Sequence, residues 1–370
     1  MAKSVALILS GGGARAAYQV GVLRGVTEII GPGKQPFDII CGTSAGAINA
    51  AHLAAFADRP GEGIERLHAR WRGLAAPAVY DTSWASVARS IGHIVSGVLR
   101  GAENGIPSSV LDNYPLRGLL KEWIDFSAIH RNLANGIVRA LAITAMNYST
   151  GESVAFYEGR EAEAWQRVHR RGEASRINVD HVMASSAIPI LFPPQRISGH
   201  YYGDGALRQL HPLSPALHLG ATDLFIIGVS ANRRDRNAGI PEESPTIAQM
   251  AGHLLNREFI DNLEADIEHA EKINELVNAS APPPEAPGAS PVSIFVVTPS
   301  ISFDEVAARY LRRQPHSMRF LFRVIGARGR GAGASFASYL MFDGGFCTEL
   351  IDAGYRDAMD NAEAIRAFLQ

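Results

Sequence analysis

The chain has 370 residues, of which 46% are hydrophobic and 19% charged. This composition is typical of a globular protein with one large or two ordinary domains, and it excludes a disordered or fibrous chain. The formal net charge of −2 at pH 7 gives no electrostatic reason to expect nucleic-acid binding. Two cysteines, Cys41 and Cys347, cannot form a disulfide framework, and no C-x-x-C or H-x-x-x-H spacing suggests a metal site. We therefore expect no metal site.

The N-terminal residues MAKSVALILSGGG contain one short apolar run that ends in glycines. That run is too short for the core of a signal peptide and is better interpreted as a first strand. No stretch approaches the about 20 apolar residues of a membrane span. We expect a cytoplasmic protein, for which any membrane contact would be peripheral, and the sequence leaves open whether it forms a homo-oligomer.

The first 56 residues predict a β-loop-α-β-turn-α unit with a parallel sheet. Residues 4–10 form a continuous apolar strand, and Gly11-Gly12-Gly13 separates it from an amphipathic helix that ends at Gly31. A second apolar strand, 37–41, leads into Gly42-Thr43-Ser44-Ala45-Gly46 and an alanine-rich helix. A G-x-S-x-G sequence between a strand and a helix is the nucleophile-elbow pattern, in which the serine hydroxyl is exposed on a sharp turn.

Residues 62–134 are predicted to be a helical insertion without a clear strand. Within it, 83–101 places apolar residues on one face, which we expect to pack on the core; a lid or a membrane-facing helix is the alternative.

Further strands are predicted at 137–148, 153–159, 224–230 and 292–299, and helices at 175–187, 246–278 and over most of 303–369. Residues 279–290 read as a proline-rich loop. There is no internal repeat and no clean break. We expect a catalytic core over 1–230 and a helical C-terminal part over 231–370, packed on the same domain.

The glycine sites have two other interpretations. Gly11-x-Gly13-x-x-Ala16 satisfies the dinucleotide-binding fingerprint, which also expects an acidic residue at the end of the second strand. Asp38 instead lies near the start of that strand. An α/β-hydrolase would need a late histidine, and no late histidine, such as His253, His269 or His316, lies in an obvious strand-to-loop context.

The glycine loop at 11–13 and the elbow at 42–46 could together form one catalytic site. The carboxyl ends of two parallel strands meet at one edge of the sheet, where ligands bind in such folds. The N–H groups of Gly11, Gly12 and Gly13 could then stabilise an oxyanion formed at Ser44. Arg15 could bind an anionic group of the substrate; an exposed arginine at the start of a helix is an equal alternative.

Ser44 needs a base, because an unactivated hydroxyl is a poor nucleophile. Asp204, in Tyr202-Gly203-Asp204-Gly205-Ala206, and Asp343, in Phe342-Asp343-Gly344-Gly345, both lie at glycine-rich turns. Asp343 also suits the N-cap of a following helix. Spacing alone does not choose between the two aspartates.

These motifs resemble those of the patatin-like phospholipases, whose pattern is G-G-G-x-[RK] followed by G-x-S-x-G. The match extends to Ala184-Ser185-Ser186-Ala187-Ile188-Pro189 and then Asp204-Gly205-Ala206, so the resemblance covers about residues 5–212. It implies a three-layer α/β/α sandwich with a mostly parallel central sheet, here with a helical C-terminal extension. It also implies a Ser-Asp dyad, and by motif order the aspartate is Asp204, with Asp343 left as a helix cap.

The resemblance implies a serine hydrolase of lipid acyl esters, of the phospholipase A or lysophospholipase type, that needs no cofactor. The sequence departs from the family pattern at Asp-Gly-Ala, where Asp-Gly-Gly is commoner, and at Ala16, where many members carry glycine. The alternatives are a catalytically weak lipid-binding or scaffold protein on the same fold and, with less support, a nucleotide-binding protein. Arginines between apolar residues at 310–331 suit either the rim of a core-packed helix or contact with an anionic membrane.

Overall fold

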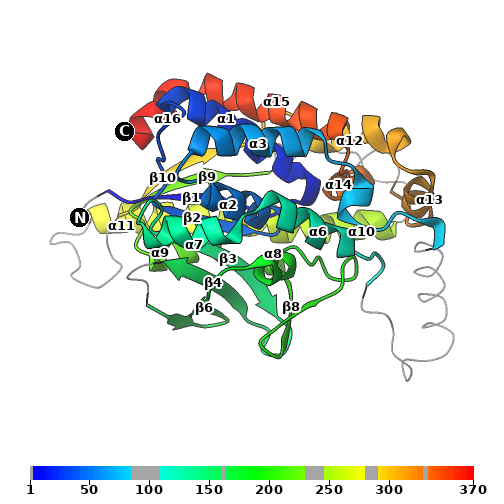
Figure 1. Cartoon of the computed structure of the whole chain (residues 1–370), viewed down its shortest axis with the longest axis horizontal. Coiled ribbons are helices and arrows are strands. Elements are labelled where there is room, and N and C mark those ends of the chain that lie inside the picture. Colours follow the sequence, from blue (N-terminus) through cyan, green and yellow to red (C-terminus); the bar gives the residue numbers. More distant parts are fainter. Residues whose placement is uncertain (1–2, 86–108, 160–162, 230–245, 280–290, 328–331) are drawn as a thin grey trace.

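The computed structural model describes residues 3–85, 109–159, 163–229, 246–279, 291–327 and 332–370 (Figure 1). The strands are β1 (Val5–Leu9), β2 (Ile39–Thr43), β3 (Ala140–Asn147), β4 (Ser153–Gly159), β5 (Trp165–Arg167), β6 (Arg170–Ala174), β7 (Gln195–Ile197), β8 (His200–Asp204), β9 (Asp223–Ile227) and β10 (Ser293–Val297). The longer helices of the first half are α1 (Ala17–Ile30), α2 (Ala45–Ala55), α3 (Pro60–Arg72), α6 (Tyr114–Trp123) and α7 (Phe126–Ala134), with the short helices α4 (Ala76–Val79), α8 (Val179–Ser185) and α9 (Ser214–His218).

The second half adds helices α10 (Ile247–Asn256), α11 (Asn262–Ala279), α12 (Phe303–Tyr310), α13 (His316–Val324), α14 (Ala332–Tyr339), α15 (Gly344–Asp360) and α16 (Ala362–Leu369). Single turns of 3-10 helix lie at Gly13–Ala16, Gly205–Arg208 and Leu311–Arg313. A π-helical turn, Arg257–Asp261, joins α10 to α11, so the stretch predicted as one helix over 246–278 continues through it.

The strands form one sheet in the order β10-β9-β1-β2-β3-β4-β6-β5, and β8 pairs with both β3 and β7. The neighbours from β10 to β3 are all parallel. Antiparallel pairing begins at β3, which pairs with β4 on one side and with the end of β8 on the other. This last pairing carries the carboxyl end of β8 to the same edge of the sheet as the end of β2.

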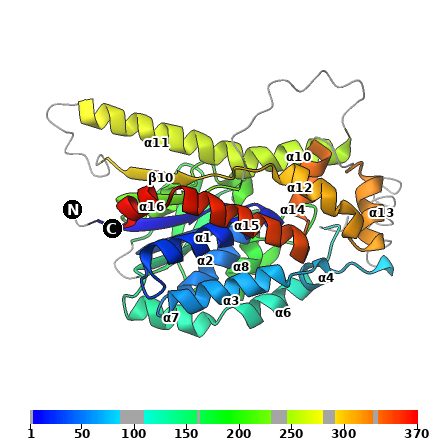
Figure 2. The same ribbon diagram turned by 90° about the horizontal axis from the view of Figure 1, so that it is seen from above.

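Helices cover both faces of the sheet, as alternation along β1 requires. Leu7 and Leu9 belong to a large apolar cluster with α1, α2, α7 and α15. Ala6 and Ile8 point the other way, into a smaller cluster with α9 and α11. Figure 2 shows α11 along the opposite side of the molecule from α3, α6 and α7. The predicted fold class, a three-layer α/β/α sandwich with a mostly parallel sheet, is confirmed.

The C-terminal part contributes to the same sheet and the same core. β10 continues the parallel sheet beside β9, within the range 292–299 predicted as a strand. α15 packs along α1, where the Tyr18 hydroxyl donates to Asp357 Oδ2 at 2.8 Å. Figure 1 shows α15 along the top of the molecule, directly above α1.

The strands β5, β6 and β7 were not predicted. β6 (RRGEA) is rich in charged side chains because it lies near the edge of the sheet, so it lacks the apolar alternation of a half-buried strand. The turn between β5 and β6 places His169 at a positive φ of 60°, without the glycine that marks such turns. The helix predicted over 175–187 begins only at Val179. Most of the predicted helix 83–101 and most of the predicted loop 279–290 lie outside the described residues.

Candidate active site

Ser44 occupies a sharp turn between β2 and α2. Its backbone angles are φ 55° and ψ −129°, and α2 begins at the next residue. A positive φ is unfavourable for a residue with a Cβ and persists only where the surroundings hold it. The side chain is 2% exposed. The predicted nucleophile elbow is therefore present as a strained, buried turn at the N-terminus of a helix.

Two neighbouring serines at the end of α8 hold this turn on both sides. The Ser44 N–H donates to Ser185 Oγ at 2.9 Å, and the Ser185 hydroxyl donates in turn to the Thr144 carbonyl at 2.6 Å. The Ser186 hydroxyl donates to the Ser44 carbonyl at 3.2 Å. Sequence reasoning used these serines as a motif and assigned them no role; small polar residues in an otherwise apolar block were the available signal.

Asp204 ends β8 and faces Ser44. The Ser44 hydroxyl donates to Asp204 Oδ2 at 2.5 Å, although the two residues are 160 positions apart. The other carboxylate oxygen, Oδ1, accepts from the Ala206 N–H at 3.0 Å, and the Asp204 N–H donates to the Ala187 carbonyl at 2.9 Å. The aspartate is thus fixed by its own turn and by the chain segment that follows Ser186.

Burial changes the acidity of Asp204. Its side chain is 1% exposed, and burial raises its pKa to about 7 because a carboxylate loses solvation in an apolar site. The hydrogen bonds from Ser44 and from the Ala206 N–H act in the opposite sense and lower the pKa. The result is a carboxylate that can accept a proton near neutral pH.

The glycine loop lies against Ser44, as the sequence analysis expected. A Cβ placed on Gly11 would be 3.0 Å from the Cβ of Ser44, which shows how closely the backbone of the loop approaches the serine. Gly13 has a φ of 55°, and a Cβ there would lie 2.2 Å from the Tyr339 carbonyl oxygen. Gly13 also lines the same cavity as Ser44. The 3-10 turn Gly13–Ala16 then leads into α1.

Buried amides connect the glycine loop to the helix that follows the elbow. Gln19 Nε2 donates to the Ser10 carbonyl at 2.8 Å, and Asn49 Nδ2 donates to Gln19 Oε1 at 2.9 Å. The Trp71 indole N–H donates to Asn49 Oδ1 at 2.9 Å. Sequence reasoning missed these residues; polar side chains on the buried faces of two predicted helices were the signal for them.

Arg15 has different neighbours from those expected of a substrate-binding residue. Its side chain is 3% exposed, and it donates to Asp304, Ser335 and Ser338 at 2.7–2.9 Å. The guanidinium also stacks over the Tyr339 ring, 4.0 Å from its centroid. Neither sequence interpretation, substrate contact or exposed helix start, describes this arrangement. Arg15 ties the glycine loop to α12 and α14, which no local pattern in the sequence could reveal.

The two remaining acidic candidates lie away from Ser44. Asp343 caps α15: its Oδ1 accepts from the N–H groups of Gly345 at 2.9 Å and Phe346 at 3.2 Å, as its capping interpretation predicted. Asp38 lies at the amino end of β2, where Oδ2 accepts from the Val5 N–H at 2.9 Å. It is therefore at the opposite end of the strand from the glycine loop.

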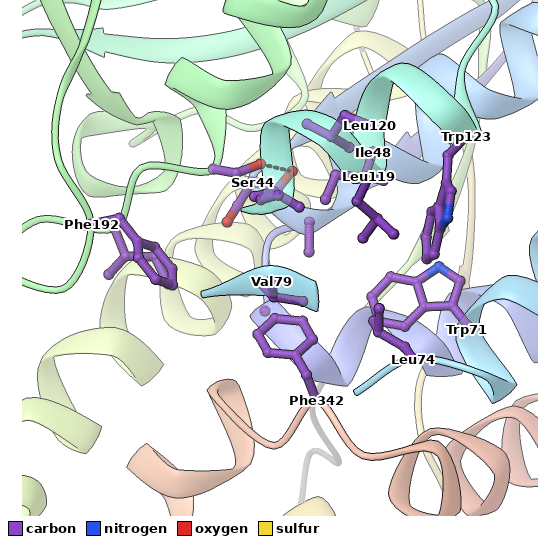
Figure 3. Close-up of a pocket in the computed structure, with 15 residues that line it drawn as sticks. Ser44, Ile48, Trp71, Leu74, Val79, Leu119, Leu120, Trp123, Phe192 and Phe342 are labelled. Atoms are coloured by element: carbon purple, nitrogen blue, oxygen red, sulfur yellow. Dashed lines mark hydrogen bonds between the residues drawn. The ribbon is translucent and has the colours of Figure 1, made fainter. Parts of the chain in front are cut away.

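A narrow cavity of about 30 Å³ opens beside Ser44 (Figure 3). Ile48, Leu119 and Leu120 lie between the serine and two tryptophans, Trp71 and Trp123, whose ring centroids are 6.3 Å apart. Apart from Ser44, Ser186 and the backbone, the lining is apolar; it is completed by Gly13, Ala45, Leu74, Val79, Leu116, Ile188, Phe192 and Phe342. The site therefore places a narrow apolar cavity next to a hydroxyl–carboxylate pair.

Within the described residues, no three His, Cys, Asp or Glu side chains come together so that they could hold a metal ion. No helix in this part of the chain has the length and apolar character that crossing a membrane would require.

A family model described as patatin-like phospholipase matches residues 7–217. A cGAMP-activated phospholipase of Pseudomonas aeruginosa (strain BWHPSA011 / Pa011) is 28% identical over 204 residues, which are 54% of this chain and 52% of that protein. Lysophospholipase nte1 of Aspergillus terreus (strain NIH 2624 / FGSC A1156) is 37% identical over 97 residues, or 25% of this chain and 6% of that protein. The chain thus spans about half the length of the first relative and a small part of the second.

Among solved structures, human GIVD cytosolic phospholipase A2, in complex with a methyl gamma-linolenyl fluorophosphonate inhibitor and terbium chloride, gives a TM-score of 0.41 at 15% identity. That similarity covers 99% of this chain and 60% of the human one. The family match is the stronger finding, because it extends over more than half of the chain and includes both Ser44 and Asp204. The chain belongs to the patatin-like phospholipase family.

Proposed function

We propose that the protein is a serine hydrolase of lipid acyl esters, of the phospholipase A or lysophospholipase type. The observation that carries this proposal is the 2.5 Å hydrogen bond from Ser44 Oγ to Asp204 Oδ2 beside an apolar cavity. The family supports the same chemistry, and two relatives bear the names of a phospholipase and a lysophospholipase.

In the first half of the reaction, Ser44 Oγ attacks the ester carbonyl carbon and its proton passes to the Asp204 carboxylate. The carbonyl π electrons move to oxygen, and the N–H groups of Gly11, Gly12 and Gly13 stabilise the resulting oxyanion, together with the N-terminus of α2. The intermediate collapses, the bond to the leaving alcohol breaks, and Asp204 returns its proton to that alcohol. Ser44 is left esterified by the acyl group.

In the second half, water attacks the acyl-serine and gives a proton to Asp204. This intermediate collapses, the bond between the acyl carbon and Ser44 Oγ breaks, and Asp204 returns its proton to Ser44 Oγ as the fatty acid is released. A carboxylate with an ordinary pKa would be a weak base for both steps. With a pKa of about 7, Asp204 lies in the range where histidine works as a general base, which accounts for a dyad without histidine.

The cavity supports a lipid rather than a polar ester as the substrate. Its apolar lining favours an acyl chain, because burying methylene groups is favourable whereas burying an unpaired polar headgroup is costly. A cavity of about 30 Å³ has room for only a few water-sized groups, so an acyl chain extending from Ser44 toward Trp71 and Trp123 would have to push the lining side chains apart (Figure 3). The headgroup would remain outside the cavity.

The test is labelling with a fluorophosphonate probe, followed by product analysis on a panel of phospholipids, lysophospholipids, triacylglycerols and soluble esters. We expect the probe to label Ser44, and we expect Ser44→Ala to abolish both labelling and ester hydrolysis. Ser149→Ala, which changes an exposed serine on the β3–β4 turn, is the matched control and should behave like the wild type.

Retention of hydrolysis in Ser44→Ala would overturn the proposal. A folded wild-type protein that binds lipid but takes up no probe and releases no fatty acid would favour the non-catalytic lipid-binding alternative. A thermal shift with NAD(P), without hydrolysis, would favour the nucleotide-binding alternative.

A further inference from the structure

Helix α13 carries an exposed apolar surface. Phe320 and Val324 lie one turn apart on this helix and are 42% and 55% exposed. Trp84 is 55% exposed, and the centroid of its ring lies 5.8 Å from that of Phe320. We call these three side chains the apolar patch. Large side chains gathered at a surface, rather than scattered singly, mark an interaction site.

The apolar patch belongs to a well-packed part of the molecule. Met318, Leu321 and Phe322, on the other face of α13, are buried in the main core. The Ser317 hydroxyl donates to the Thr82 carbonyl at 2.5 Å, which joins α13 to the segment that carries Trp84. The helix therefore keeps one apolar face in the core and presents a second one to solvent.

Helix α13 lies in a part of the sequence that is rich in positive charge. Residues 306–342 contain seven arginines and no aspartate or glutamate, in a chain with a net charge of −2. One of these arginines, Arg309, pairs with Glu349. On α13 itself, Arg319 and Arg323 immediately precede Phe320 and Val324. Within the described residues, neither guanidinium forms an ion pair with a carboxylate. The combination is apolar side chains flanked by cations that have no protein counter-ion there.

The apolar patch lies at the end of the molecule that contains the cavity. Val79 lines the cavity, and Trp84 follows five residues later, so the two are within about 18 Å of each other. Between them, the Tyr80 ring packs against Phe192 and Phe342, both of which line the cavity. Figure 2 shows α13 at the same end of the molecule as α4.

We propose that the apolar patch, with Arg319 and Arg323, docks the protein on an anionic lipid bilayer. This inference rests on the proposed function, because the docking surface would bring the hydrolase to the bilayer that contains its lipid substrate. Aromatic side chains favour the membrane interface, and arginines near the surface are attracted to anionic headgroups. A second copy of the chain is a poorer occupant, because a two-fold contact would bring two arginine-rich surfaces together.

The test uses the Ser44→Ala protein, so that binding is measured without consumption of the lipid. Co-sedimentation with vesicles of phosphatidylcholine alone is compared with vesicles containing phosphatidylglycerol. The variants are Trp84→Ala/Phe320→Ala and Arg319→Gln/Arg323→Gln. The matched control is Arg59→Gln/Arg66→Gln, which removes two exposed arginines at α3.

We expect the parent protein to bind the anionic vesicles at least about tenfold more strongly than the neutral ones, and added salt to weaken that binding. Each patch variant should lose at least about tenfold in partitioning, whereas the α3 control should not change. With Ser44 restored, the same variants should hydrolyse vesicle lipid at least about tenfold more slowly and a soluble ester at the wild-type rate.

Vesicle binding that is unaffected by both patch variants would overturn the proposal, whether or not the protein is a hydrolase. A patch variant that converts a dimer to a monomer in size-exclusion chromatography, with vesicle binding unchanged, would assign the surface to self-association instead. Loss of soluble-ester hydrolysis in Ser44→Ala tests the proposed function separately, because that assay involves no membrane.

Discussion

Two aspartates in this molecule have nearly the same local sequence and different structural settings. Asp204 precedes Gly-Ala and Asp343 precedes Gly-Gly, and each accepts a hydrogen bond from a backbone N–H two residues later. Asp343 uses one oxygen, Oδ1, for two N–H groups of α15. Asp204 uses Oδ1 for its own turn, which leaves Oδ2 to accept from Ser44.

The difference between them comes from what packs around each turn. β8 carries Asp204 to the sheet edge beside Ser44, because its last residues pair with β3, the neighbour of β2. Asp343 instead lies at the start of α15, in the helical layer. Its backbone forms an isolated antiparallel bridge with that of Ala75. An Asp-Gly turn is thus a capping device by default, and it becomes a candidate base only where one carboxylate oxygen is left for a nucleophile.

The largest expected effect that separates the two aspartates is on activity. Asp204→Asn removes the proton acceptor while keeping the shape of the side chain, so we expect kcat for ester hydrolysis to fall at least about 10³-fold. Asp343→Asn should stay within about twofold of the wild type, because asparagine also caps helices well. Steady-state kinetics on a soluble ester measure both variants.

Thermal unfolding of the two asparagine variants provides the control for that comparison. Each should remain folded, so that a change in kcat reports on chemistry. If Asp343→Asn abolished activity while Asp204→Asn retained it, the base would have been assigned to the wrong aspartate.

The second effect is on pH dependence. Because burial raises the pKa of Asp204 to about 7, kcat/KM should rise about tenfold per pH unit below pH 7 and level off above it. The stability of the fold should change with pH in the opposite direction. In the unfolded chain the pKa of Asp204 is about 3.9, so the folded protein binds this proton more tightly. The stabilisation that the bound proton provides is complete below pH 4 and is lost as the pH rises through 7.

Asp204→Asn tests the predicted loss of stability with rising pH directly, because it removes the group that titrates. From pH 5 to pH 8, the variant should gain on the order of 2–3 kcal/mol in unfolding free energy relative to the wild type. Chemical denaturation at several pH values measures the difference. Parallel stability curves for the two proteins would show that Asp204 does not titrate in this range.

Local sequence patterns predicted the sheet core and the elbow because the interactions that form them are local. The apolar strands, the glycine loop and the G-x-S-x-G turn each lie within a few residues, and their order predicted an α/β unit with a parallel sheet. The three-layer sandwich was implied by the family resemblance. The choice between Asp204 and Asp343 needed family motif order, since the pairing of β8 with β3 joins residues far apart in sequence.

Arg15 shows where such reasoning ends. The segment that follows the glycine loop suggested a substrate contact or an exposed helix start, and the partners that bury its guanidinium come from residues 304–339. The same holds for Ser185 and Ser186, whose partners lie in β3 and at the elbow. Long-range polar contacts leave no periodic pattern in a sequence, so they emerge only from the folded arrangement.

The smallest expected effect belongs to Asp343 and concerns stability alone. Asp343→Ala removes the acceptor for the N–H groups of Gly345 and Phe346, and loss of an N-cap costs about 1 kcal/mol, within a range of about 0.5–2 kcal/mol. Asp343→Asn, which keeps a capping oxygen, should cost less than about 0.5 kcal/mol. Urea unfolding of both variants measures the difference. Equal losses of stability in the two variants would mean that the negative charge of Asp343, and not its capping oxygen, stabilises α15.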